Sequence, residues 1–187
     1  MKLKKVNAVL ALLSTIALFL HMGYNAWSYL TFYYNPTMKN LTSWPLMVLT
    51  CAHAVCGMCT VFLMGDGTRM GAYGKLNKKT VIQRVTAALI FPLLIVHMNT
   101  FNLLQSSAVN GQWWLFAVLI LVQLAFYAVI TMHTAVSFSK ALITLGLLGD
   151  INKQKAIDRV FGIICTALLL VTSFAVVKGQ LAMFLPK

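Results

Sequence analysis

Acidic side chains are almost absent from this chain of 187 residues, which has three Asp or Glu residues against fifteen Lys or Arg and a net charge of +12. Charged residues of both signs make up only 10% of the sequence, whereas soluble domains have about 25%. Hydrophobic residues make up 60%. This composition excludes a water-soluble domain and a disordered chain. The basic excess is not typical of nucleic-acid binding, because the basic residues are confined to short stretches between long apolar runs.

Long polar connections are also lacking, since no loop exceeds about 16 residues and none could hold a soluble domain. A transmembrane helix needs about 20 mostly apolar residues. Five segments meet this requirement, at residues 6–32, 42–64, 81–104, 113–148 and 157–177. No small-residue cleavage site follows the first segment, so we expect it to be a retained helix. The sequence therefore predicts an all-α, polytopic membrane protein, with residues 1–187 forming a single five-helix transmembrane domain.

The distribution of basic residues predicts the orientation in the membrane. With the N-terminus in the cytoplasm, twelve Lys and Arg residues fall on the cytoplasmic side and three on the other. Cytoplasmic loops carry such an excess of positive charge, so we expect a cytoplasmic N-terminus and a C-terminus outside. Trp44, Trp113 and Trp114 then fall at the opposite interface, where aromatic belts occur.

Each of the four histidines, His21, His53, His97 and His133, falls in a different one of the first four segments. Polar groups inside a bilayer are costly, so an intramembrane imidazole indicates a functional site. Two imidazoles on facing helices can ligate one haem iron in the six-coordinate form that suits electron transfer. Four histidines on four helices thus predict two bis-histidine haems of the b type. The chain lacks the C-x-x-C-H motif of covalent haem attachment.

Depth along the helices predicts how the histidines pair. At 1.5 Å per residue, His21 lies about 24 Å beyond Lys5 and His97 about 20 Å beyond Arg84, so both belong to the outer half. His133 lies seven residues before Lys140, about 10 Å from the cytoplasmic edge. By elimination, His53 pairs with His133. We therefore expect an outer haem on His21 and His97 and an inner haem on His53 and His133.

Two small features near these histidines suit a flat cofactor. Gly57 follows His53 by one helical turn and leaves space for a macrocycle, although close helix packing would also explain it. Pro92 precedes His97 by five residues, where it could kink the helix. The four cysteines all lie inside the predicted segments, where we interpret them as packing residues.

The residues quoted above resemble a known family, the single-chain, five-helix, dihaem cytochrome b anchor of succinate:menaquinone and menaquinol:fumarate oxidoreductases. The segment Gln83-Arg84-Val85-Thr86, with His97 thirteen residues after the arginine, is similar to the family's Q-R-V-T-G segment and the ligand histidine that follows it. His53-Ala54-Val55-Cys56-Gly57 matches the family's H-A-x-x-G pattern. The resemblance covers nearly the whole chain, but Ala87 replaces the usual glycine and Val136-Ser137 replaces an Asn-Gly pair.

The resemblance implies a role in respiratory electron transport in the bacterial cytoplasmic (inner) membrane. The cytoplasmic face would dock an iron–sulfur subunit that carries a flavoprotein with covalent FAD, where succinate and fumarate interconvert. This chain would have no dicarboxylate site. It would be the membrane subunit of the oxidoreductase complex and would pass electrons between the iron–sulfur clusters, two haem b groups and menaquinone.

The resemblance also suggests residues around the cofactors. Arg84, Arg69 and Lys75 are candidates to balance the charge of the inner haem propionates, although the last two would equally be ordinary positive-inside residues. If the quinone binds near the outer haem, the candidate lining residues are Tyr24, Asn25, Trp27, Tyr29 and Asn99. Residues 1–65 contain no acid, so an outer quinol site would need water or a histidine as its proton route.

Two alternatives remain open. The chain could be the cytochrome b anchor of a nitrate reductase, hydrogenase or formate dehydrogenase, but those anchors typically place two histidines on one helix. It could instead be a haem-free, proton-coupled membrane protein, a class that the scarcity of intramembrane acids and the absence of an inverted repeat disfavour.

Overall fold

The computed structural model describes residues 2–63 and 78–185, and this part of the chain contains five α-helices and no strand. They are α1 (Lys2–Thr31), α2 (Pro36–Leu63), α3 (Lys78–Val109), α4 (Trp113–Leu145) and α5 (Ile151–Phe184). All five are long and apolar enough to cross a membrane. The prediction of an all-α protein with five membrane-spanning helices is confirmed. At 1.5 Å per residue, a 30-residue helix such as α1 is about 45 Å long, enough for the hydrocarbon core and both headgroup regions.

The ends of the helices follow local capping chemistry. Asn35 precedes α2, and its Oδ1 accepts a hydrogen bond from Met38 N at 3.2 Å. α4 ends at Leu145, three residues before the predicted end, because Gly146 adopts a left-handed conformation with φ of 79°. Asp150 caps α5 by accepting a hydrogen bond from Asn152 N at 2.7 Å. α3 continues through Pro92, and α2 through Pro45.

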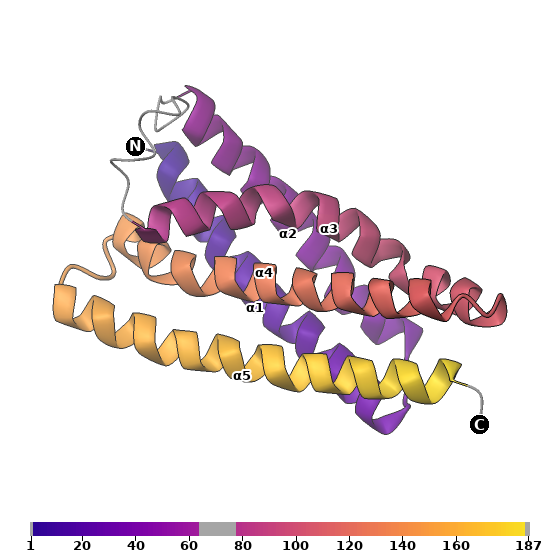
Figure 1. Ribbon diagram of the computed structural model, residues 1–187. Helices are drawn as coiled ribbons and strands as arrows, with labels where there is room; N and C mark the ends of the chain where they lie inside the picture. The colour runs from indigo at the N-terminus through magenta and orange to yellow at the C-terminus, as the bar shows by residue number, and fades with distance from the viewer. Residues whose placement is uncertain (1, 64–77, 186–187) are drawn as a thin grey trace.

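The helices pack as two hairpins, which are held together by α5 and by direct contact between α1 and α4. α1 packs along α2, α3 packs along α4, and α5 contacts both α1 and α4 (Figure 1). α2 packs extensively only against α1, and none of its side chains is buried. The N- and C-termini lie at opposite ends of the bundle (Figure 1). The side of α2 that does not face α1 therefore has little protein packed against it.

Most of the basic residues gather at one end of the bundle, where α1, α3 and α5 begin and α2 and α4 end (Figure 1). We call this the basic end, and its described residues are Lys2, Lys4, Lys5, Lys78, Lys79, Arg84, Lys140, Lys153, Lys155 and Arg159. In the rest of the described chain the basic residues are Lys39 and Lys178, near the other end. This separation is the asymmetry on which the predicted orientation depends.

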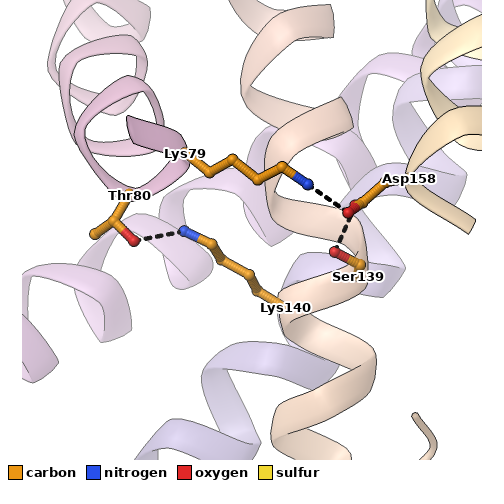
Figure 2. Close-up of polar contacts among 5 residues, drawn as sticks. All are labelled: Lys79, Thr80, Ser139, Lys140 and Asp158. Atoms are coloured by element: carbon orange, nitrogen blue, oxygen red, sulfur yellow. Dashed lines mark hydrogen bonds and ion pairs between the residues drawn. The ribbon is translucent and has the colours of Figure 1, made fainter. Parts of the chain in front are cut away.

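A polar cluster joins three helices at the basic end (Figure 2). Lys79 of α3 forms an ion pair with Asp158 of α5, and Ser139 Oγ of α4 donates a hydrogen bond to the same carboxylate at 2.7 Å. Lys140 of α4 donates to Thr80 Oγ1 of α3 at 2.9 Å. The Asp158 side chain is 16% exposed, so the pair is only partly screened by solvent. These contacts fix the relative positions of α3, α4 and α5.

A close approach of α1 and α5 generates a stability prediction. A Cβ placed on Gly179 would lie 2.4 Å from Tyr29 Cδ1 and 3.0 Å from Tyr29 Cβ. Gly179→Ala should therefore push the two helices apart and lower the free energy of unfolding by about 1–3 kcal/mol. Thermal unfolding of the purified protein in detergent measures this change. Gly162→Ala on the same helix is the control, because its Cβ would meet no atom within 4 Å. Equal effects of the two substitutions would contradict the packing described for α5.

Candidate functional site

The four histidines occupy four separate helices, and all four side chains are half-buried. His21 lies on α1, His53 on α2, His97 on α3 and His133 on α4. The structure brings the rings of His53 and His133 close together, whereas the pairing of His21 with His97 stays a prediction.

The closer pair is His53 and His133. Their ring centroids are 6.4 Å apart, and the ring planes are inclined by 62°. Two imidazoles that ligate one metal ion from opposite sides, with bonds of about 2 Å each, have centroids about 6 Å apart. The observed spacing therefore fits an axial ligand pair. The two rings approach each other although their helices, α2 and α4, do not pack extensively.

The hydrogen bonds of this pair leave one nitrogen of each ring for a ligand. His133 Nδ1 lies 3.1 Å from the carbonyl oxygen of Gln83, and His53 Nδ1 lies 3.3 Å from that of Asn7. A carbonyl oxygen can only accept, so the proton of each ring is on Nδ1. The Nε2 lone pairs are then available. Histidines that bind metals donate their other ring N–H in this way, so the residues present fit bis-histidine ligation.

Thr86 is a further partner of His133. Its Oγ1 lies 3.0 Å from His133 Nδ1 and 2.7 Å from the carbonyl oxygen of Ile82. The hydroxyl donates its proton to that carbonyl and accepts from the imidazole. Thr86 is 5% exposed, so its interaction with the ring is shielded from solvent. The start of α3 thus fixes the orientation of His133 through Thr86 and Gln83.

The second pair, His21 and His97, lies farther along the bundle from the basic end. No ring contact or hydrogen bond joins the two residues in the described part of the chain. Nδ1 of each ring is buried and has no hydrogen-bond partner. Asn25 Nδ2 lies 3.1 Å from His21 Nε2, and His97 stacks on Phe126 with centroids 4.8 Å apart. Buried polar atoms without partners are costly. An amide N–H can only donate, so the Nε2 lone pair of His21 is engaged by Asn25, and the outer pair lacks the free ligand atoms seen at His53 and His133.

The residues expected around the inner haem are only partly described. A Cβ on Gly57 would meet a single atom within 4 Å, Asn7 Oδ1 at 3.9 Å, so this side of α2 has space. Arg84 is half-buried on α3. Arg69 and Lys75 lie outside the described residues.

Lys140 is a site residue that the sequence analysis did not nominate. Its Nζ donates to Gln83 Oε1 at 2.9 Å, and the backbone carbonyl of Gln83 faces His133. Its distance from His133 in the sequence could have indicated this role, because a residue seven positions after His133 lies two turns along the same face of α4. Lys140 therefore supplies a cation beside the inner pair.

The five residues expected to line a quinone site differ in their burial and in their hydrogen bonds. Tyr24 Oη is hydrogen-bonded to the backbone of Asn35, and Asn25 lies beside His21. Trp27 is 60% exposed, and the exposed Asn99 bonds to Ile95 of its own helix. Tyr29 packs against Gly179 in the interior. Asn25 is the member of this set that touches a proposed ligand.

A buried polar chain next to His97 was not expected. Gln180 Nε2 donates to Gln123 Oε1 at 2.9 Å, and Gln123 Nε2 donates to Tyr127 Oη at 2.7 Å. The ring of Tyr127 meets His97 edge-on, with centroids 5.9 Å apart. The three residues are at most 6% exposed. Gln180 was overlooked because the last apolar segment was expected to end at residue 177, whereas α5 continues to Phe184.

Other metal chemistry has little support in the described residues. They contain no group of three or more His, Cys, Asp or Glu side chains that could hold a metal ion. Cys51, Cys56, Cys59 and Cys165 are free thiols.

Comparisons of the chain with protein-family models, curated proteins and solved structures give no match in any of the three. The fold and the facing rings of His53 and His133 define the chain as a multi-pass, helical membrane protein in which two helices bring a pair of imidazoles together.

The buried polar chain gives a prediction about coupling. Gln123→Leu leaves both Gln180 Nε2 and Tyr127 Oη without the partners described above, and it should lower the free energy of unfolding by about 1–3 kcal/mol. The double variant Gln123→Leu/Gln180→Leu should cost less than the sum of the two single changes, because the partners are removed together. Unfolding of the four proteins in a double-mutant cycle measures the coupling. Gln105→Leu, an exposed position on α3, is the control. Strict additivity would contradict the hydrogen bond between the two glutamines.

Proposed function

We propose that this chain is the dihaem cytochrome b anchor of a succinate:menaquinone or menaquinol:fumarate oxidoreductase. In this role it passes electrons between an iron–sulfur subunit and a membrane quinone. The observation that carries the proposal is the facing pair His53 and His133, with ring centroids 6.4 Å apart and Nδ1 of each ring on a backbone carbonyl. The sequence resemblance supplies the class of enzyme, and the ligand geometry supports the cofactor.

The residues of this chain would bind and orient two haem b groups. His53 and His133 would hold the inner group, and His21 and His97 the outer one. Bound haem supplies reversible one-electron chemistry. Thr86 and the carbonyls of Asn7 and Gln83 keep a proton on Nδ1 of the inner ligands and thereby hold their Nε2 atoms in place. Lys140 and Arg84 would balance the propionate charge at the same level.

The bundle would carry electrons across the membrane because its two histidine pairs lie at different depths. The basic end faces the cytoplasm in this proposal, as the positive-inside asymmetry favours. An iron–sulfur subunit and its flavoprotein would dock there, and dicarboxylate chemistry would take place on the flavoprotein. Asn25, beside His21, would be the first contact for menaquinone on the outer side. The location would be the bacterial inner membrane.

Single histidine substitutions test the cofactor and the pairing together. The purified protein, reduced with dithionite, should show the α-band of b-type haem. His53→Ala and His133→Ala should each remove the same haem, because each deletes one axial ligand of one iron. His21→Ala and His97→Ala should remove the other. Potentiometric titration followed by visible absorption identifies which haem is lost.

Asn99→Ala, with an exposed side chain that bonds only to its own helix, is the control and should retain both haems. A colourless wild-type protein would contradict the cytochrome and favour a haem-free membrane protein. Loss of the same haem from His53→Ala and His97→Ala would contradict the pairing.

A second prediction concerns Thr86. Thr86→Val removes the hydroxyl that accepts from His133 Nδ1, so His133 becomes a less electron-rich ligand. The reduction potential of the inner haem should rise by an amount on the order of 20–40 mV, which corresponds to the free energy of about one hydrogen bond. Thr86→Ser, which keeps the hydroxyl, should restore the wild-type potential. Thr100→Val is the matched control, because this equally buried threonine of α3 bonds only to Val96 O. An equal shift in both valine variants would mean that Thr86 acts through packing.

A further inference from the structure

His97 is held by aromatic contacts with α4. Its ring stacks on Phe126, with centroids 4.8 Å apart and planes inclined by 29°, and it meets Tyr127 edge-on at 5.9 Å with an inclination of 71°. Stacked and edge-to-face arrangements are the favoured geometries of such contacts. His53 and His133 each have a backbone carbonyl at Nδ1, whereas Nδ1 of His97 has no hydrogen-bond partner among the described residues. The orientation of the His97 ring therefore depends on the two rings of α4.

Of these two rings, Tyr127 is the one with a polar anchor. Its Oη accepts a hydrogen bond from Gln123 Nε2, one turn earlier on α4, at 2.7 Å. Phe126 has no polar side-chain atom and is held by packing alone. Tyr127 and Gln123 are each 6% exposed, so the hydrogen bond between them is shielded from water. This bond fixes where the Tyr127 ring lies against His97.

The helix α5 has no histidine, but it reaches this anchor through Gln180. Gln180 Nε2 donates a hydrogen bond to Gln123 Oε1 at 2.9 Å, and the Gln180 side chain is 1% exposed. The amide of Gln123 thus accepts from α5 and donates to Tyr127. Hydrocarbon offers these amides no other partner. The position of α5 is therefore linked, through two hydrogen bonds and one aromatic ring, to the orientation of His97.

We propose that Gln123 and Gln180 are positioning residues. They hold the Tyr127 ring against His97 and thereby keep this imidazole in the orientation that binds the outer haem. The proposal rests on the proposed function, because it takes His97 as a haem ligand. Groups that orient a metal-binding histidine do not touch the metal, but their loss weakens metal binding by roughly 10–100-fold. The effect should be confined to the outer haem, because backbone carbonyls orient the inner ligands.

Release of haem from the purified full-length protein, with any subunits that copurify, tests the proposal. The oxidised protein in detergent is mixed with excess apomyoglobin, and haem transfer is followed by visible absorption. The outer haem is the one missing from His97→Ala, and the haem that remains is identified by its reduction potential. Tyr127→Phe, which keeps the ring without the hydroxyl, should speed release of the outer haem by about tenfold and leave the inner haem unchanged. Gln123→Leu should have the same effect, because it removes the same hydrogen bond.

A double variant and two further single variants separate positioning from stability. Tyr127→Phe/Gln123→Leu should release the outer haem no faster than either single variant, because one hydrogen bond is lost in all three. Gln180→Leu should give a smaller increase, because the bond between Gln123 and Tyr127 remains. Thr131→Val is the control and should leave both release rates unchanged. It removes a buried hydroxyl of α4 that bonds to carbonyl oxygens of its own helix.

Electron paramagnetic resonance of the oxidised protein gives a second readout, which a merely structural role would not move. The low-spin signal of a bis-imidazole haem depends on the angle between the two ring planes. The signal of the outer haem should therefore shift in Tyr127→Phe, while the signal of the inner haem stays in place. Gel-filtration volume and circular dichroism establish that the variants are folded.

Four results would overturn the proposal. Faster release of both haems would mean that the glutamines act through the stability of the bundle. Unchanged release in Tyr127→Phe would mean that Phe126 alone fixes the ring of His97. An unchanged rate in Gln180→Leu would exclude the link to α5, and an increase in Thr131→Val as large as that in Tyr127→Phe would assign the effect to any buried hydroxyl of α4.

These four results leave the proposed function intact, because each is obtained on a protein that binds two haems. A wild-type protein without haem, or His97→Ala with both haems retained, would instead remove the proposed function, and the positioning role of the glutamines with it.

Discussion

The spacing of His53 and His133 is the constraint on which the functional account depends. Two imidazoles face each other at 6.4 Å from helices that do not otherwise pack closely. Hydrocarbon offers no hydrogen bonds, so polar rings inside a bundle need partners from the protein or from a ligand. The inner rings find one partner each in a backbone carbonyl, and their second nitrogens remain for a metal. None of the side chains of α2 is buried, so this helix has little protein packed against it apart from α1.

Hydrogen bonds and an ion pair between helices hold in place the helices that carry the histidines. At the basic end, Asp158 holds α3 and α4 against α5, while Lys140 ties α4 to the turn of α3 that supports His133 (Figure 2). Farther along the bundle, Gln123 and Gln180 join α4 to α5 beside His97. Loss of any one of these contacts would lower the free energy of unfolding, because a polar group would stay buried without a hydrogen-bond partner. The histidine pairs are therefore supported by bonds between helices as well as by packing.

Composition and hydropathy alone predicted the five helices, since each apolar segment is long enough to span lipid as a helix, which satisfies its own backbone hydrogen bonds. Depth also predicted that His53 and His133 are neighbours, because the rise per residue of a helix is fixed, whereas the pairing of His21 with His97 stays a prediction. Rotation about the helix axes could not be predicted in the same way. Lipid-facing and interior surfaces are both apolar, so the periodicity that marks the buried face of a soluble helix is weak here. For this reason the sequence did not indicate that Trp27 and Asn99 are exposed or that Gln180 is buried.

The central claim is that separate membrane-spanning helices clamp iron porphyrin between paired imidazoles. The most direct test is the haem content of the purified chain, determined as pyridine haemochrome against protein mass from amino-acid analysis. The account predicts two non-covalently bound haem b groups per polypeptide, both low-spin with two nitrogen ligands. A polypeptide that carries no haem, or one haem that leaves a histidine pair uncoordinated, would contradict it.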